Sequence, residues 1–162
     1  MADNAANVVH EVSEAGRQSH VIADAVVLPV GSLVQLESGF ANHWDETGSF
    51  LGLAINGNPP DGRAADGVHT GETSDDVPPE MTVDTSGVTL KHLDSVAGTP
   101  AQAKVGDLVF SATSNTDDMT MTDTTNPPVG YLSRFVTTTD VDVTLFTPEA
   151  HAAGIADATW NV

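Results

Sequence analysis

The side chains that could carry out metal or acid–base chemistry are a set of histidines and a large excess of carboxylates. A zinc site needs ligands at short, regular spacings, and cysteine, a common zinc ligand, is absent from this chain. The histidines are instead spread along the whole chain: His10, His20, His43, His69, His92 and His151. We therefore predict that they are exposed to solvent and that the protein holds no metal and no cofactor.

Some of the carboxylates gather in turns that could meet a cation. Two such groups occur: Asp117-Asp118 with Asp123, and Asp61, Asp66 and the pair Asp75-Asp76. Neither group has the alternating ligand order and the closing glutamate of a calcium loop. A solvated acidic turn is therefore favoured over a cation site.

Nucleophilic chemistry has little to build on in this sequence. It contains no Gly-x-Ser-x-Gly elbow, no cysteine and no glycine loop that could cradle a phosphate. Carboxylate pairs are abundant, but they follow from the composition and indicate no particular reaction. We predict that the protein is not an enzyme.

The charge balance excludes some partners and suggests an environment. With 23 acidic and 5 basic residues the net charge is −18, which repels phosphate backbones and argues against nucleic-acid binding. The excess suits either an ordinary acidic protein or one adapted to high salt, where a Debye length of about 3 Å screens self-repulsion. Because the acids are scattered over the chain and do not form a tail, we favour adaptation to high salt.

The N-terminal segment looks neither like a leader nor like part of the core. Met1 to Asn4 lack the basic start and apolar run of a signal peptide, and no apolar run of the chain approaches the length of a membrane span. Residues 1–20 are polar and rich in alanine, which predicts an extended arm that orders against a partner. We expect no contact with a membrane.

The remainder predicts an all-β domain over residues 21–149, a compact barrel or sandwich of short strands separated by regular turn signals. Thr147 reads as the N-cap and Pro148 as the first position of a short helix, so residues 150–162 are predicted as helix and C-terminal tail. The predicted strands span residues 21–28, 31–36, 50–55, 88–93, 107–111, 119–122, 129–136 and 140–146.

A pattern of three pieces occurs twice, which predicts two loosely repeated three-strand units. The first copy carries a Gly-, Pro- and Asp-rich insertion from Asn58 to Thr85, which we expect to project as a loop. We predict structural roles for the shared glycines, as bends at strand entrances and as mid-strand bulges. The matched pieces are Val30–Val34 with Val105–Val109, Phe50–Ala54 with Pro128–Leu132, and Gly87–Leu90 with Asp142–Leu145.

Two tryptophans stand out because aromatic residues make up only 5% of the chain. Trp44 lies in a polar stretch and Trp160 near the C-terminus, so each either docks locally or anchors an interface, where tryptophan is enriched. The residues predicted to form a capsid or subunit interface are Val8, Val9, Val12, Val21, Ile22, Trp44 and Trp160.

The segments Gly106–Val109, Pro128–Tyr131 and Val141–Leu145 resemble motifs of the head-decoration (cement) proteins of tailed viruses. The likeness covers about Val21 to Glu149. It implies a β-barrel-like domain on the outer surface of an icosahedral capsid, bound to the major capsid protein, often as a homotrimer and with a contacting N-terminal arm. Together with the acid excess, it suggests a tailed virus of a halophilic archaeon.

We therefore expect a structural virion protein that stabilises the assembled capsid from outside. The alternative is a virion-surface or secreted β-sandwich that recognises carbohydrate or a host surface through the Asn58 to Thr85 loop. A hydrolase with an acid pair is a third hypothesis, and the residues favour it least.

Overall fold

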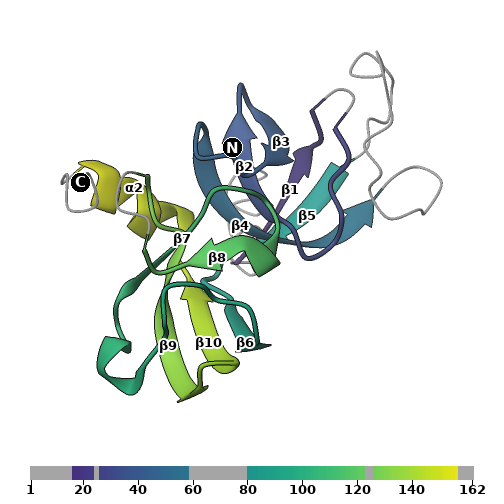
Figure 1. Cartoon of the computed structure of the whole chain (residues 1–162). Helices are drawn as coiled ribbons and strands as arrows, with labels where there is room; N and C mark the ends of the chain where they lie inside the picture. Colours follow the sequence, from purple (N-terminus) through teal and green to yellow (C-terminus); the bar gives the residue numbers. More distant parts are fainter. Residues whose placement is uncertain (1–15, 24–25, 59–79, 123–125, 157–162) are drawn as a thin grey trace, which may run out of the picture.

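The computed structural model describes residues 16–23, 26–58, 80–122 and 126–156. These residues fold into two five-stranded antiparallel sheets followed by a short helix, α2, which spans Pro148–Ala156 (Figure 1). The predicted all-β class and C-terminal helix are thus confirmed. Within the described residues, no helix has the length and apolar character needed to cross a membrane.

The first sheet has the strand order β1-β5-β4-β2-β3. Ser38 and Gly39 link β2 to β3 with positive φ angles of 53° and 87°, the backbone of the tight turns that join twisted hairpins. Phe40–His43 therefore pairs back on β2, although its polar sequence predicts a loop. The strands are β1 (Arg17–Val21), β2 (Leu33–Glu37), β3 (Phe40–His43), β4 (Ser49–Asn58) and β5 (Glu80–Asp84).

The second sheet has the order β6-β10-β9-β7-β8 and lies below the first in the view of Figure 1. Two short 3-10 helices, η2 (Gln102–Lys104) and η3 (Thr116–Asp118), lie in its connections. The strands are β6 (Thr89–Leu93), β7 (Leu108–Ser111), β8 (Met119–Thr120), β9 (Gly130–Thr137) and β10 (Asp140–Leu145).

The two sheets have the same topology, so the repeat extends to five strands per unit. In the first unit, Gly31 N–H donates to Ala54 O at 2.7 Å and Ala54 N–H to Ser32 O at 2.9 Å. In the second, Gly106 N–H donates to Leu132 O at 2.7 Å and Leu132 N–H to Asp107 O at 2.9 Å. Each unit also has one isolated parallel bridge from the segment that follows its first edge strand to its other edge strand, Ile22 with Ala41 in β3 and Ala97 with Thr120 in β8, so each sheet curls toward closure.

The prediction that Gly87–Leu90 is the third piece of the repeat in the first unit is wrong. Gly52 packs against the backbone of Asp84, and Gly130 packs in the same way against Thr144. The counterpart of β10 is therefore β5, whereas Gly87–Leu90 leads into the second unit. The predicted loop from Asn58 to Thr85 is also too long, because Asn58 ends β4 and Glu80–Asp84 forms β5; the intervening part lies outside the described residues.

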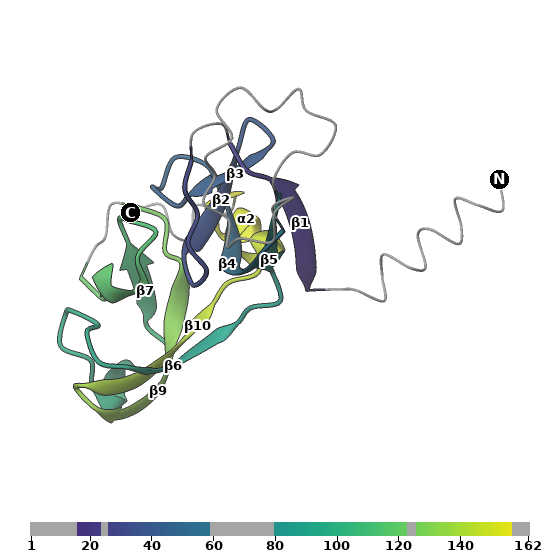
Figure 2. The same cartoon turned by 90° about the vertical axis from the view of Figure 1, so that its right-hand side faces the viewer.

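The predicted arm over residues 1–20 is wrong at its C-terminal end. Arg17 to Val21 forms β1 and pairs with β5 along its whole length, at the edge of the first sheet in Figure 2. Among the described residues of the strand predicted over residues 21–28, only Val21 belongs to a strand; Ile22 forms an isolated bridge, and both Ile22 and Leu28 are buried in the core. The polar sequence RQSHV carries no apolar alternation and therefore does not predict β1.

Two buried clusters form the core, and β2 and β4 contribute to both. Val34 and Leu51 face the cluster of the first unit, whereas their neighbours Leu33 and Phe50 face the cluster of the second. Successive side chains of a strand point to opposite faces, so both faces of these strands are covered. The two units are therefore packed against each other through β2 and β4.

Candidate functional site

A groove with a volume of about 600 Å³ opens between α2 and the first sheet. Thr147 caps the helix by accepting the N–H of Ala150 at 3.1 Å, as its position before Pro148 predicts. A nine-residue helix is too short to be stable alone, so α2 depends on its packing against β4. The apolar walls of the groove come from Leu36, Phe50, Leu51, Pro148, Ala152 and Ile155.

His151 lines this groove with only 2% of its surface exposed. Its ring lies 5.6 Å from that of Trp44, edge to face, and 5.3 Å from that of Phe50. Burial lowers the pKa of His151 to about 4, and a hydrogen bond with the backbone of Pro128 opposes this shift. The predicted exposure of the histidines is therefore wrong for His151, because the short helix gives no signal of which face is covered.

We expect this histidine to make the fold sensitive to mild acid. Its pKa in the folded state lies below the ordinary value of 6.5, so the unfolded chain binds more protons between these values and stability falls as the pH drops from about 6.5 to about 4. Between pH 7 and pH 5 the free energy of unfolding should fall by about 1–2 kcal/mol more in the wild type than in His151→Leu. Urea titrations at both pH values measure this difference. Identical losses in the two proteins would contradict it.

Trp44 is a core residue of the inter-sheet packing, not the interface anchor suggested by its polar neighbourhood. It is 1% exposed and its indole N–H donates to the carbonyl of Ser111 in β7 at 2.8 Å. The backbone pairing of Trp44 N–H with Leu33 O places the ring between the two units.

The other predicted interface residues divide into three groups. Ile22 is fully buried in the first cluster, so the interface prediction is corrected for it as well as for Trp44: neither side chain offers surface to a partner in this fold. Val21 is half-buried on the edge strand β1 and stays a prediction. The rest lie outside the described residues: Val8, Val9, Val12 and Trp160.

A second group of titratable side chains joins β6 to β10. His92, Asp140 and Asp142 place possible ligand atoms within 4.8 Å of one another. His92 Nδ1 lies 2.9 Å from Asp140 Oδ1, and the backbone N–H of His92 donates to Asp142 Oδ1 at 3.0 Å. Arg134 Nη1 lies 3.6 Å from Asp142 Oδ2.

A β-bulge between β6 and β10 explains why these side chains lie together. The register of β10 against β6 shifts between Val141 and Val143, and His92 has a φ of +57° there. Asp142 is 5% exposed and accepts the backbone N–H of His92, as expected of a side chain that stabilises a bulge. A histidine and two carboxylates could also bind a divalent cation, but these atoms already hydrogen-bond within the protein. No sequence pattern predicts this group, because His92 and Asp140 are 48 positions apart.

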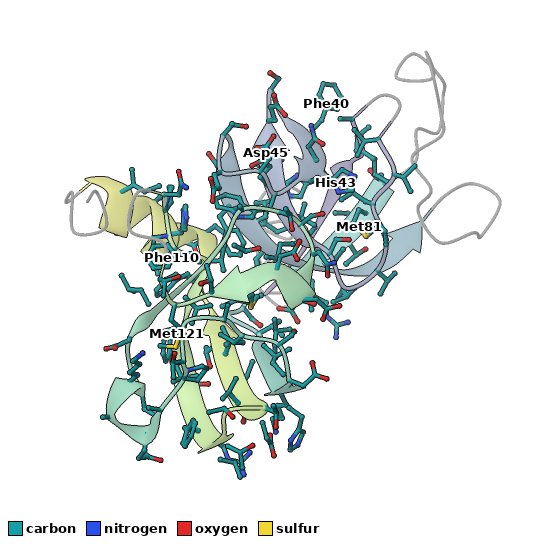
Figure 3. The ribbon with its side chains drawn as sticks, in the orientation of Figure 1. Phe40, His43, Asp45, Met81, Phe110 and Met121 are labelled. Carbon is teal, nitrogen blue, oxygen red and sulfur yellow. The ribbon has the colours of Figure 1, made fainter. Side chains whose placement is uncertain are left out.

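A buried glutamine organises the loop beside the groove. Gln35 is fully buried; its amide donates to Asp45 Oδ1 at 2.7 Å and accepts from Gly48 N–H at 3.0 Å. The hydroxyl of Thr47, followed by other hydrogen bonds, lowers the pKa of Asp45 despite the opposing effect of desolvation. Figure 3 shows Asp45 with His43 and Phe40 in the first unit, well away from Phe110 and Met121 of the second.

Asp117 and Asp118 of the acidic turn at η3 are exposed, and local hydrogen bonds hold this turn. Asp118 Oδ2 accepts from the hydroxyl of Thr113 at 2.6 Å, and Asn115 Oδ1 accepts the N–H of Asp117 at 3.0 Å. The remaining predicted acidic candidates lie outside the described residues: Asp61, Asp66, Asp75, Asp76 and Asp123.

Comparisons with known proteins identify no relative. No family matches the chain, and neither curated proteins nor solved structures show significant similarity to it.

Proposed function

We propose that this protein is a structural virion protein that binds the outer surface of an assembled icosahedral capsid and stabilises it. One observation carries the proposal: the three segments that resemble head-decoration proteins are neighbours in a single sheet. Gly106–Val109 enters β7, Pro128–Tyr131 enters β9 and Val141–Leu145 lies in β10, and the sheet order places these strands side by side. The resemblance therefore rests on one contiguous piece of the fold.

The packing of the two units supports the same role. Because β2 and β4 are covered on both faces, the units should act as one rigid scaffold, which a protein that braces a lattice needs. Many modest contacts, repeated over a capsid, give high avidity without a deep binding site. The net charge of −18 suits the high-salt habitat that we propose for the virus and its archaeal host.

We place the contact with the major capsid protein at the N-terminal side of the first sheet. β1 is the edge strand there and pairs with β5 along one side, and Val21 is half-buried at its end. An edge strand offers free backbone groups to a partner. The segment that precedes β1 contains Val8, Val9 and Val12, which would add apolar contact area. We propose that the bound form is a homotrimer.

The test is binding to capsids in molar NaCl. The full chain should co-sediment at a fixed stoichiometry with undecorated capsids of the virus that encodes it, and light scattering gives the mass of the free protein. A variant that lacks residues 1–15 should bind at least several-fold more weakly, because it loses the apolar contact area of Val8, Val9 and Val12, and its thermal unfolding is measured beside that of the full chain.

Two outcomes would overturn the proposal. Full-length protein that remains in the supernatant at saturating concentration does not decorate capsids. Binding to glycans or to host envelopes instead would favour the carbohydrate- or host-recognition alternative.

A further inference from the structure

The groove beside α2 remains open on the side where the described chain ends. Ile155 lines the groove and is 47% exposed, although it is the last large apolar side chain of the helix. The helix ends one residue later, at Ala156, and Trp160 follows four positions further on. At about 3.6 Å per residue, four residues reach no further than about 14 Å. Trp160 is therefore tethered close to the open groove.

The chemistry of the groove suits an indole. Its walls are apolar, and an indole that docks there removes both its own surface and that of Ile155 from water. Indole N–H is a donor only, so it needs an acceptor when it is buried. Glu149, on the first turn of α2, lines the same groove and offers carboxylate oxygens.

We propose that the groove between α2 and the first sheet is the docking site for the side chain of Trp160 of the same molecule. The short tether favours this occupant, since it keeps the indole at a high effective concentration beside the groove. The other candidate occupant is the N-terminal segment, which is joined to the chain at Gly16, close in sequence to Gln18 of the groove wall. A tryptophan covers more apolar surface than any valine of that segment. Docking would hold the last turn of α2 against β4.

Acrylamide quenching of tryptophan fluorescence tests this in the isolated protein. Trp44 is buried, so any readily quenched emission reports Trp160. We expect the wild type to show little readily quenched emission. Ile155→Asp should increase the quenching several-fold and shift the emission to the red. Val136→Asp is the matched control, because Val136 is 44% exposed and lies in β9, away from the groove.

The double variant Ile155→Asp with Trp160→Phe separates undocking from unfolding. Its only tryptophan is Trp44, so emission that stays resistant to quenching shows that the core is intact. A wild type in which half of the emission is quenched as in free tryptophan would overturn the proposal. Protection of Trp160 that is lost on dilution would also overturn it, because this would mean docking between two copies. Protection that is lost when residues 1–15 are removed would overturn it as well, because this protection would depend on the N-terminal segment. None of these outcomes bears on capsid binding, which the co-sedimentation test decides separately.

Discussion

Alanine in place of Gly52 or Gly130 should lower the free energy of unfolding by about 3 kcal/mol or more, the largest effect that we expect from a single methyl group. A Cβ atom at Gly52 would lie 2.1 Å from the carbonyl oxygen of Asp84, and one at Gly130 would lie 2.3 Å from that of Thr144. Both oxygens belong to sheet backbone, so neither strand can move away without loss of its pairing. Denaturant titration of each variant in molar NaCl measures the loss.

The repeat supplies its own controls. Gly31 and Gly106 occupy equivalent turns with φ angles of +91° and +101°, but a Cβ atom there would meet nothing within 4 Å. Alanine at these positions should cost only the strain of the left-handed backbone, about 1–2 kcal/mol. Equal losses at all four glycines would mean that close strand contact is not what selects glycine at Gly52 and Gly130.

Trp44→Ala should lower the free energy of unfolding by about 3–5 kcal/mol, the range for truncation of a large buried aromatic side chain. The ring contacts Phe50 and His151 and is hydrogen-bonded to the backbone of β7, so its removal opens a cavity between the two units. Trp44→Phe should cost about 1–3 kcal/mol, chiefly because the carbonyl of Ser111 loses its donor. Circular dichroism during urea unfolding follows both variants without the need for tryptophan emission.

The shape of the same transitions tests how the units are coupled. Since β2 and β4 face both clusters, the wild type should unfold in one step and Trp44→Ala should do so at lower denaturant concentration. Val136→Ala, at an exposed position of β9, should leave the midpoint nearly unchanged. Two separate transitions in the wild type would show that the units fold independently and that Trp44 does not join them.

The two units share a topology, but each carries a local feature that the other lacks among the described residues. The first unit has α2 and the groove against its sheet, whereas the second has the bulge at His92 and Asp142. Thr82 occupies in the first unit the position that Asp142 occupies in the second. β5 pairs there with β1 without a bulge. The groove and the bulge thus distinguish two otherwise equivalent scaffolds.

The sequence by itself determined the features that depend on a few neighbouring residues. The capped start of α2 at Thr147 and the paired glycines of the repeat could both be predicted. Turn geometry, capping and left-handed backbone are local properties, and alternation of side chains is enough to indicate an all-β chain. The first two pieces of the repeat were found for the same reason.

Only the tertiary structure decided which polar-looking segments became strands and which side chains became buried. β1, β3 and β5 have mixed sequences and form because partner strands satisfy their backbone, up to 67 positions away in the pairing of Arg17 with Asp84. Trp44 and His151 are buried because the second sheet and α2 cover them, which nothing within a few residues of either reveals. Which sheet or helix covers the second face of a strand depends on how the whole fold packs. The residues of that strand alone do not show it.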